Sequence, residues 1–224
     1  MARGLFDGRR RGWLALAVAC ACAAPAAAAE SETRDFVLTV DGKRAGDVHM
    51  TISRQDDGVV TVSCDTDVKV GGFLFTYKYS YRGKEVWKDG RIQQFDSKTN
   101  DNGTEYVVAA RAEDDGLRVR VNKVERKTRA DVWPTSYWGQ PDAKLDGKTV
   151  PLLDADTGRD LDAKVTFVGP EEIGPEGQTQ TLQHVKLSGK VEVDLWYDDA
   201  KRLAREEWVE DGHKTQLELV RVRR

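Results

Sequence analysis

The chain has 224 residues, of which 39% are hydrophobic, 33% charged and 8% aromatic. This is the composition of a globular protein, and it excludes collagen-like, disulfide-dense and intrinsically disordered classes. The formal net charge is −3, with acidic and basic residues interspersed along the chain, so we expect no concentrated basic face and exclude nucleic acid as a partner.

Residues 1–29 have the pattern of an export signal. A positive segment at residues 9–11 is followed by an apolar stretch at residues 13–24, and Ala27 and Ala29 provide the small side chains that signal peptidase accepts. We therefore expect cleavage before Glu30, export through the Sec route, and a mature protein that is periplasmic or secreted.

Two other export routes stay open. Residues 10–14 partly resemble a twin-arginine motif, whereas residues 16–20 form only a poor lipobox, which does not favour a lipoprotein. The apolar stretch is shorter than the roughly 20 strongly apolar residues of a membrane-spanning helix, and no other segment approaches that length. We expect no transmembrane span in the mature chain.

Residues 30–224 are predicted to form a single all-β domain. Apolar and polar residues alternate with a period of two, which is typical of half-buried strands, in residues 36–40, 48–52, 60–64, 119–121 and 191–195. Between such segments lie dipeptides typical of tight hairpin turns, at residues 41–42, 57–58, 71–72, 89–90, 102–103, 115–116, 188–189 and 211–212. The spacing predicts one antiparallel meander of about ten to twelve strands, forming a strongly curved sheet or half-barrel.

The mature chain would contain one cysteine, Cys64, and therefore no internal disulfide. Cys64 shares its alternation phase with Val60 and Val62. We interpret it as a buried, inert side chain, with a reactive thiol as the alternative.

An aromatic stripe is the strongest feature of the sequence. Because alternate side chains of a strand project from one face, a single face carries Phe73, Phe75, Tyr77, Tyr79 and Tyr81. Either this strand crosses the core with its tyrosine hydroxyls near water, or the rings line a groove for an apolar or glycan ligand. By the same rule, Trp196 and Tyr197 lie on opposite faces of a later strand.

Residues 123–147 break the strand rhythm. A Pro- and Gly-containing connection at 131–139 includes Trp133, Tyr137 and Trp138. We expect a short helical turn there, capped by Asp131, although the residue before a proline favours an extended backbone. The connection either plugs one end of the sheet or forms the lid of a cavity.

The tripeptide Asp156-Thr157-Gly158 also occurs in aspartic proteases, which need two such carboxylates that share a proton. The sequence contains one copy, so a protease would have to be a homodimer. A tight turn explains the tripeptide more simply, because Asp and Thr bond to nearby backbone and Gly accepts a positive φ.

No other motif indicates catalysis. His49, His184 and His213 lack a second ligand at metal-binding spacing. The segment 147–149 lacks the upstream glycine of a phosphate loop, and no nucleophile elbow is present. We expect no metal and no cofactor, and favour a protein that is not an enzyme.

Several segments together resemble a family of secreted proteobacterial proteins, domain of unknown function 6134. The segments that carry this resemblance are Phe36 to Gly42 with Gly46, Trp133 to Trp138, Pro151 to Gly158, Val165 to Gly169, Leu195 to Asp198 and Gly212 to Val222. The resemblance implies an exported, all-β protein without an assigned activity. The layout is loosely similar to the half-barrels of periplasmic lipoprotein carriers, a likeness of fold that does not by itself assign function.

Two functional hypotheses follow. The first is a binding module for an apolar small molecule or lipid, with a concave face formed by Phe73, Phe75, Tyr77, Tyr79, Trp133, Tyr137, Trp138 and Trp196. The second is a structural or interaction protein of the cell envelope, with an envelope protein as partner and a core filled by its own side chains.

Overall fold

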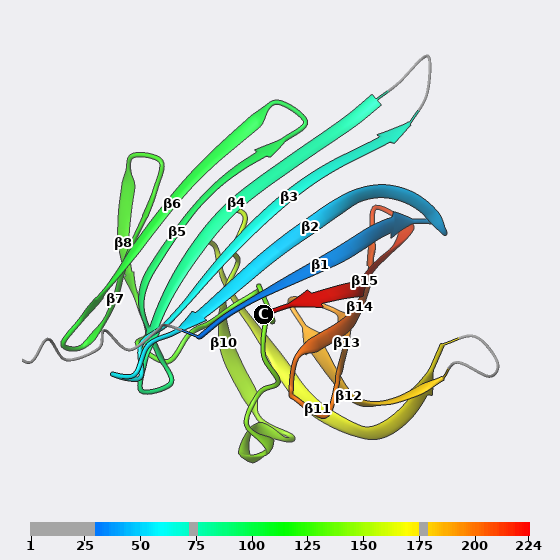
Figure 1. Cartoon of the computed structure of the whole chain (residues 1–224). Helices are drawn as coiled ribbons and strands as arrows, with labels where there is room; N and C mark the ends of the chain where they lie inside the picture. Colours follow the sequence, from blue (N-terminus) through cyan, green and yellow to red (C-terminus); the bar gives the residue numbers. More distant parts are fainter. Residues whose placement is uncertain (1–29, 72–75, 175–178) are drawn as a thin grey trace, which may run out of the picture.

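The computed structural model describes residues 30–71, 76–174 and 179–224. Within these residues fifteen strands form one strongly curved sheet (Figure 1). In chain order the elements are β1 (Glu30–Val40), β2 (Lys43–Arg54), β3 (Val60–Gly71), β4 (Thr76–Lys88), β5 (Arg91–Asp101), β6 (Thr104–Glu113), β7 (Gly116–Val121), β8 (Val124–Thr128), β9 (Trp133–Pro134), the 3-10 helix η1 (Ala143–Leu145), β10 (Thr149–Leu153), β11 (Asp160–Ile173), β12 (Gln180–Gly189), β13 (Val193–Tyr197), β14 (Leu203–Glu210) and β15 (His213–Arg223).

The first and last strands lie next to each other in the middle of the sheet. The spatial order is β8-β7-β6-β5-β4-β3-β2-β1-β15-β14-β13-β12-β11-β10-β9, so the free edges are β8 and β9. Neighbouring strands are antiparallel, except that the short β9 runs parallel to β10. The predicted all-β, antiparallel, strongly curved sheet is confirmed.

The predicted hairpin turns form where Asp-Gly and Asn-Gly dipeptides occur. Both central residues have positive φ, as the right-handed twist of a tight hairpin requires, at residues 41–42, 89–90, 102–103 and 211–212. The turns at 41–42, 102–103 and 211–212 lie at one end of the sheet, which we name the rim, and residues 154–158 pack inside the curve near it, against β5–β7. The hydrogen bond of 2.7 Å between His213 Nδ1 and Asp41 Oδ2 joins two of these turns.

The strand number was predicted too low, at ten to twelve instead of the fifteen in the described part of the chain. The β7–β8 turn has Asn122 at a φ of 52° without a following glycine, and the β13–β14 turn has Lys201 at a φ of 59°. Neither turn carries the Asn-Gly or Asp-Gly signal on which the prediction relied. The two-residue β9 is also too short to show alternation.

Alternating side chains build the core on the concave face. Phe36 of β1 and Met50 and Ile52 of β2 are almost fully buried there, together with Val185 and Leu195 from the opposite side of the curve. A second cluster beside the first is centred on Phe95, Leu117 and other inward residues of β5–β7. The inward phase of each strand is therefore set by the period-two pattern of its sequence.

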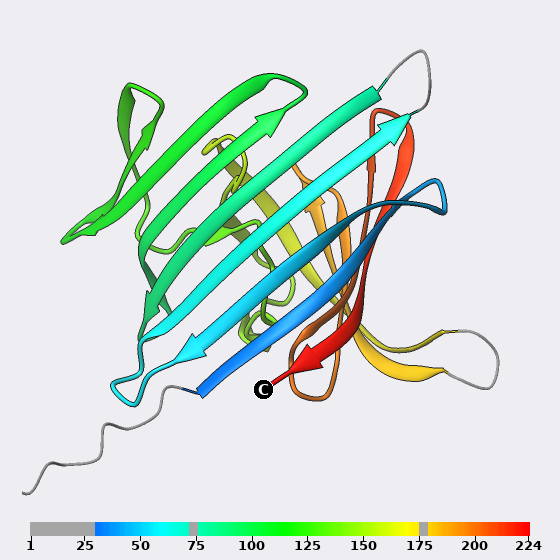
Figure 2. The same ribbon diagram turned by 45° about the horizontal axis from the view of Figure 1, so that its top comes forward.

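The connection from β8 to β10 runs inside the curve of the sheet. Figure 2 shows this green to yellow segment behind the long strands β2–β5. The predicted helical turn at Asp131 is wrong, because Trp133 and Pro134 instead extend along β10, and Thr135 donates its backbone N–H to the Leu153 carbonyl at 3.1 Å. The 3-10 turn of the connection is η1, which is capped by Asp142.

A buried ion pair holds the connection in place. Arg34 on β1 is 2% exposed, and its Nε donates to Glu32 Oε1 at 2.7 Å. Its Nη1 also donates to the Trp138 carbonyl oxygen at 2.6 Å. The guanidinium thus links β1 to the middle of the chain.

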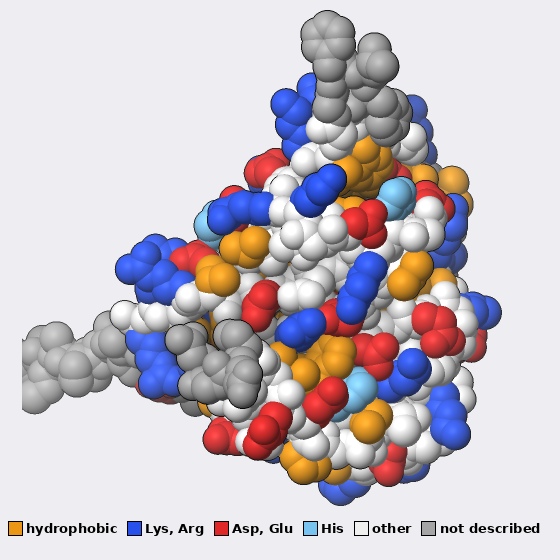
Figure 3. All heavy atoms as spheres, turned by 90° about the vertical axis from the view of Figure 1, so that its right-hand side faces the viewer, with side chains coloured by type: hydrophobic (Ala, Val, Ile, Leu, Met, Phe, Trp, Pro, Cys, Tyr) orange, Lys and Arg blue, Asp and Glu red, His pale blue; other side chains and the backbone are white. Residues whose placement is uncertain are grey.

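Charged side chains of both signs are dispersed over the face in Figure 3, with small hydrophobic patches between them. This distribution agrees with the sequence, from which no concentrated basic face was expected. Among the described residues, no helix is long and apolar enough to span a membrane.

Candidate functional site

The predicted aromatic stripe is partly visible. Tyr77, Tyr79 and Tyr81 share the inward phase of β4, opposite Val70, Val68 and Thr66 of β3. Exposure falls along the stripe, from half-buried Tyr77 and Tyr79 to Tyr81 at 6%. Phe73 and Phe75 lie outside the described residues.

The three aromatics of the connection fill the interior. Tyr137 is 2% exposed and packs edge-to-face against Trp133, with ring centroids 5.2 Å apart. Trp138 packs in the same way against Trp87, at 6.1 Å. Tyr137 and its two tryptophan neighbours belong to the main core cluster, so this part of the connection is a plug.

Trp196 does not belong with the other predicted site residues. It lies on the outer face of β13, where its ring stacks on His184 at a centroid distance of 4.5 Å and its Nε1 donates to Glu171 at 2.8 Å. Tyr197 faces inward instead and donates its hydroxyl to the Tyr137 carbonyl oxygen at 3.2 Å. The two side chains lie on opposite faces, as predicted, and it is Tyr197 that joins the interior.

At the rim, three inward aromatics each donate to a carboxylate. Tyr77 Oη donates to Asp101 at 2.8 Å, and Tyr79 Oη donates to Asp156 at 2.5 Å. The third bond, from Trp208 Nε1 to Glu210, is longer at 3.3 Å. With Glu206, these residues form a group that we name the rim cluster: Tyr77, Tyr79, Asp101, Asp156, Glu206, Trp208 and Glu210.

The Asp-Thr-Gly turn brings Asp156 to the rim cluster. Asp154 accepts from the backbone N–H of Asp156 at 3.0 Å and from the Thr157 hydroxyl at 2.6 Å, and Gly158 takes a φ of +69°. The predicted turn is confirmed. Its Ala155 carbonyl accepts from the buried Ser97 hydroxyl at 2.7 Å, which anchors the turn against β5.

Burial shifts the titration of the rim cluster. Burial raises the pKa of Asp156 to about 6, and the charges of Asp154 and Glu210 add to this, although the hydrogen bond from Tyr79 opposes the shift. Burial and the charge of Asp156 raise the pKa of Glu206 to about 8. Burial, together with the Asp156 charge, also raises the pKa of Tyr79.

Two inward polar groups lack a hydrogen-bond partner among the described residues. The Glu206 carboxyl accepts no hydrogen bond and meets no cation there, and burial and Asp156 alone shift its pKa. The buried Tyr137 hydroxyl has no hydrogen-bond partner either. It lies close enough to Glu206 and Asp154 that their charges raise its pKa, in addition to burial.

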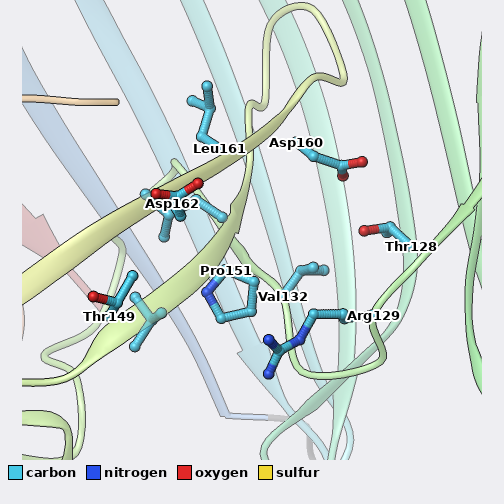
Figure 4. Close-up of a pocket in the computed structure, with 10 residues that line it drawn as sticks. Thr128, Arg129, Val132, Thr149, Pro151, Asp160, Leu161 and Asp162 are labelled. Atoms are coloured by element: carbon cyan, nitrogen blue, oxygen red, sulfur yellow. The ribbon is translucent and has the colours of Figure 1, made fainter. Parts of the chain in front are cut away.

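Two cavities in the described part of the chain have distinct linings. One, of about 240 Å³, lies between the end of β8 and strands β10 and β11, and Figure 4 shows its side chains, which include Arg129, Pro151 and Asp160. The other, of about 410 Å³, extends over β2–β5 near the rim, and Tyr79 lines it. Of the predicted binding residues that the structure describes, only Tyr79 lines either cavity.

The histidines pair with acids on the surface. His49 contacts Asp35, and His184 contacts Glu171 and Asp194. Within residues 30–71, 76–174 and 179–224, no three His, Cys, Asp or Glu side chains come close enough together to hold a metal ion.

Cys64 faces the interior, as its phase with Val60 and Val62 predicted. It is half-buried and packs against both core clusters. Burial raises the pKa of its thiol to about 12, so the thiolate that reactive cysteines need is disfavoured.

The comparisons with known proteins identify a family. The family model "Domain of unknown function (DUF6134)" matches residues 36–220. The chain belongs to the DUF6134 family. This confirms the resemblance found in the sequence, and the match includes β2–β14, the second half of β1 and most of β15.

A solved structure shares the fold of this DUF6134 protein. It is a beta-barrel-like protein of domain of unknown function DUF1849 from Brucella abortus, with a TM-score of 0.62 and 12% sequence identity. The alignment covers 86% of the DUF6134 chain and 96% of the Brucella chain. A search of curated proteins finds no match. At this identity the likeness shows the fold alone.

Sequence reasoning did not connect the carboxylates of the rim cluster with the aromatic stripe; these are Asp101, Asp156, Glu206 and Glu210. Glu206 has inward phase because it pairs with Leu195 and Leu217. An acidic residue at an inward position between apolar neighbours was the signal that could have found it. Asp156 carries no such signal, because acidic residues are common in turns.

Proposed function

We propose that this DUF6134 protein is an exported, non-enzymatic binding module that holds a compact ligand at the rim cluster. The observation that carries the proposal is the set of three aromatic–carboxylate hydrogen bonds at the rim, from Tyr77, Tyr79 and Trp208. Aromatic faces supply contact area and carboxylates supply directed acceptors, the combination by which proteins bind small polar ligands.

The plug argues against a long lipid chain as the ligand. A chain laid along the concave face would have to displace Trp133, Tyr137 and Trp138, which pack in the main core cluster. It would also break the bond from Arg34 to the Trp138 carbonyl. The rim offers a smaller area, lined by carboxylates, so the proposed ligand is compact and polar.

The proposal that the protein is not an enzyme rests on the chemistry of Asp156. This carboxylate already accepts from Tyr79 and, at 3.4 Å, from Thr99. The sequence has one Asp-Thr-Gly tripeptide, whereas an aspartic protease shares a proton between two. A binding role makes use of Asp156 as an acceptor without that second copy.

Export is proposed from the pattern of residues 1–29. N-terminal sequencing of the protein purified from the envelope fraction is expected to begin at or near Glu30. An intact Met1, or a lipid attached to Cys20, would contradict a cleaved signal peptide.

Binding is tested by native mass spectrometry of the protein extracted gently from the cells that produce it. We expect a small bound molecule, whose retention falls when Trp208 and Tyr77 are both changed to Ala. Val209→Ala is the matched control, because Val209 is adjacent on β14 and exposed at 69%. No bound mass in any preparation, with no binding of added small molecules, would contradict the proposal.

A structural or interaction role in the envelope is the second candidate. It is favoured by the plug, which fills much of the concave face with the protein's own side chains. In that case an envelope protein would be the partner, and chemical crosslinking in intact cells would capture it without any small molecule at the rim.

A further inference from the structure

We propose that four side chains on the outer face of β3–β5 bind a single phosphate group; these are Lys69, Lys78, Ser80 and Asn100. The phosphate belongs either to a small soluble molecule or to a lipid headgroup. The tyrosines of the rim cluster point to the opposite face of β4. This second site is therefore separate from the rim and goes beyond the proposed function.

The register of three neighbouring strands places the four side chains together. Lys69 of β3 lies directly opposite Lys78 of β4, and Ser80 of β4 lies directly opposite Asn100 of β5. Lys78 and Ser80 are two residues apart on one strand, so they project from the same face. Opposite Cβ atoms are roughly 5 Å apart, and residues i and i+2 of a strand are roughly 7 Å apart. The four side chains therefore surround one small area of the sheet.

All four residues line the cavity of about 410 Å³ that extends over β2–β5. Their strand neighbours Val68 and Tyr79 face the interior, where Val68 is buried and Tyr79 donates to Asp156. Because neighbouring side chains alternate, the four polar side chains face outward. The volume lies within the range of roughly 300–1,000 Å³ that is typical of small-molecule sites.

The two lysines form an uncompensated pair of like charges. Such a pair, directly opposite on neighbouring strands, destabilises a sheet. In the described part of the chain, the ammonium groups of Lys69 and Lys78 make no hydrogen bond and no salt bridge. The carboxylate in the cavity lining is that of Asp67, which Arg82 already binds at 2.6 Å. An anion between the two ammonium groups would relieve their repulsion.

The other two side chains add neutral hydrogen-bond donors. Asn100 Oδ1 accepts from the backbone N–H of Gly103 at 2.8 Å, so the NH₂ group of this amide is left to donate to a ligand. The Ser80 hydroxyl has no hydrogen-bond partner among the described residues. Four donors, two of them charged, match the three acceptor oxygens of a phosphate better than the two of a carboxylate. Lysine is also a common phosphate ligand in proteins.

Isothermal titration calorimetry at low ionic strength tests the site, because salt screens exposed charges. The probes are inorganic phosphate and acetate, and we expect phosphate to bind at least about fivefold more tightly. Cosedimentation with vesicles of phosphatidylglycerol or phosphatidylcholine identifies the source of the phosphate. Binding of inorganic phosphate without vesicle binding would assign a soluble ligand, whereas preferential binding of phosphatidylglycerol vesicles would assign a lipid headgroup.

Lysine variants locate the site. Lys69→Gln and Lys78→Gln should each weaken binding by about tenfold. Lys84→Gln is the matched control and should bind like the parent, because Lys84 is exposed on the same face of β4, unpaired among the described residues and outside the cavity lining. Phosphate should raise the unfolding temperature of the parent and of Lys84→Gln, but not that of the Lys69→Gln, Lys78→Gln double variant. The same unfolding curves establish that each variant is folded.

Acetate binding as tight as phosphate binding would overturn the assignment. So would a loss of binding in Lys84→Gln equal to that in the other variants, or unchanged binding in both Lys69→Gln and Lys78→Gln. Absence of binding to every probe and vesicle would overturn it as well. Changing Tyr77 and Trp208 to Ala should leave phosphate binding intact, so failure of this site leaves the proposed function of the rim standing.

Discussion

At the residue scale, the raised pKa of the Glu206 carboxyl lowers the stability of the folded protein at high pH. Its carboxyl has a pKa of about 8 in the folded protein, against an ordinary value of 4.5. The folded state therefore keeps the proton over a pH range in which the unfolded chain has lost it. Because the unfolded state binds fewer protons, stability falls as pH rises between these two values and the loss is complete above the higher one.

We therefore predict that Glu206→Gln stabilises the protein at high pH. The slope removed is about 1.4 kcal/mol per pH unit between about pH 4.5 and 8. Urea unfolding at a series of pH values measures it, with Glu207→Gln as the control for charge on the same strand. A parent and variant with parallel stability curves would show that Glu206 is solvated in the folded state.

Cys64 gives a second prediction at this scale. Because burial raises its pKa to about 12, native protein should react with a maleimide far more slowly than unfolded protein. Cys64→Ala should cost on the order of 1 kcal/mol, since a small apolar group replaces another at a half-buried position. Rapid labelling under native conditions would contradict the inward placement of this side chain.

At the scale of elements, the 154–158 turn requires glycine at position 158 for two reasons, the backbone conformation and the lack of space for a Cβ. Gly158 has a φ of +69°, and a Cβ added there would lie 2.6 Å from Val121 Cγ2 and 3.0 Å from Val108 Cγ1. Gly42 has a similar φ of +73°, but nothing lies within 4 Å of its Cβ position. The two positions separate backbone strain from packing.

We expect Gly158→Ala to destabilise the protein more than Gly42→Ala. Both variants pay about 1 kcal/mol for the left-handed backbone, and Gly158→Ala adds about 1–3 kcal/mol for overpacking. Chemical denaturation of the two variants measures the difference. Equal losses would mean that the turn shifts away from β6 and β7 without cost.

The plug is the other element that organises the interior. Trp138→Ala should cost about 3 kcal/mol, because a large ring is removed from a packed cluster, whereas Trp208→Ala at the rim should cost less. Thermal unfolding distinguishes the two tryptophans. A larger loss of stability for Trp208→Ala would show that Trp208 packs as a core residue, which would weaken the proposal that the rim binds a ligand.

At the scale of the whole molecule, β15 joins the two halves of the open sheet. This strand pairs with β1 on one side and β14 on the other, so the last strand joins the two halves of the curve. Leu217, buried at 7% exposure, contributes to the main core cluster. Without β15, both of its neighbours would become unprotected edges.

Deletion of residues 213–224 should therefore prevent formation of a soluble folded protein. Deletion of Arg223 and Arg224 alone is the control, because the ion pairs of these residues with Asp35 and Glu32 involve exposed arginines and should contribute about 1 kcal/mol or less. Size-exclusion chromatography and circular dichroism of both truncated forms make the comparison. A folded monomer lacking β15 would refute its role in joining the halves.

Both free edges of the open sheet carry features that disfavour pairing with another chain. At one edge, β8 has five residues, of which Glu125, Arg126 and Lys127 are charged. At the other edge, the two-residue β9 pairs only with Leu152 and Leu153 of β10, and Pro151 lies beside the part of β10 that stays unpaired. Charged residues and proline at sheet edges disfavour pairing with another chain. Arg126 also bonds to the Gly158 carbonyl and to Asp160, which links β8 to the β10–β11 turn.

The local order of this protein was readable in its sequence. Period-two alternation gave the inward phase of β1, β2 and β3, and hence the orientation of Cys64. The Asp-Gly and Asn-Gly turns were predicted because only a few residue types accept positive φ at low cost. The opposite orientation of Trp196 and Tyr197 followed from the same strand geometry.

The tertiary structure alone decided which inward residues meet. Tyr79, Asp156 and Glu206 come from β4, a turn and β14, and they converge only because the sheet curves and β1 pairs with β15. The rules that set strand phase act over two to four residues, whereas pairing of the first and last strands depends on the free energy of the whole core. For that reason the aromatic stripe could be predicted from the sequence, whereas the position of the carboxylates beside it could not.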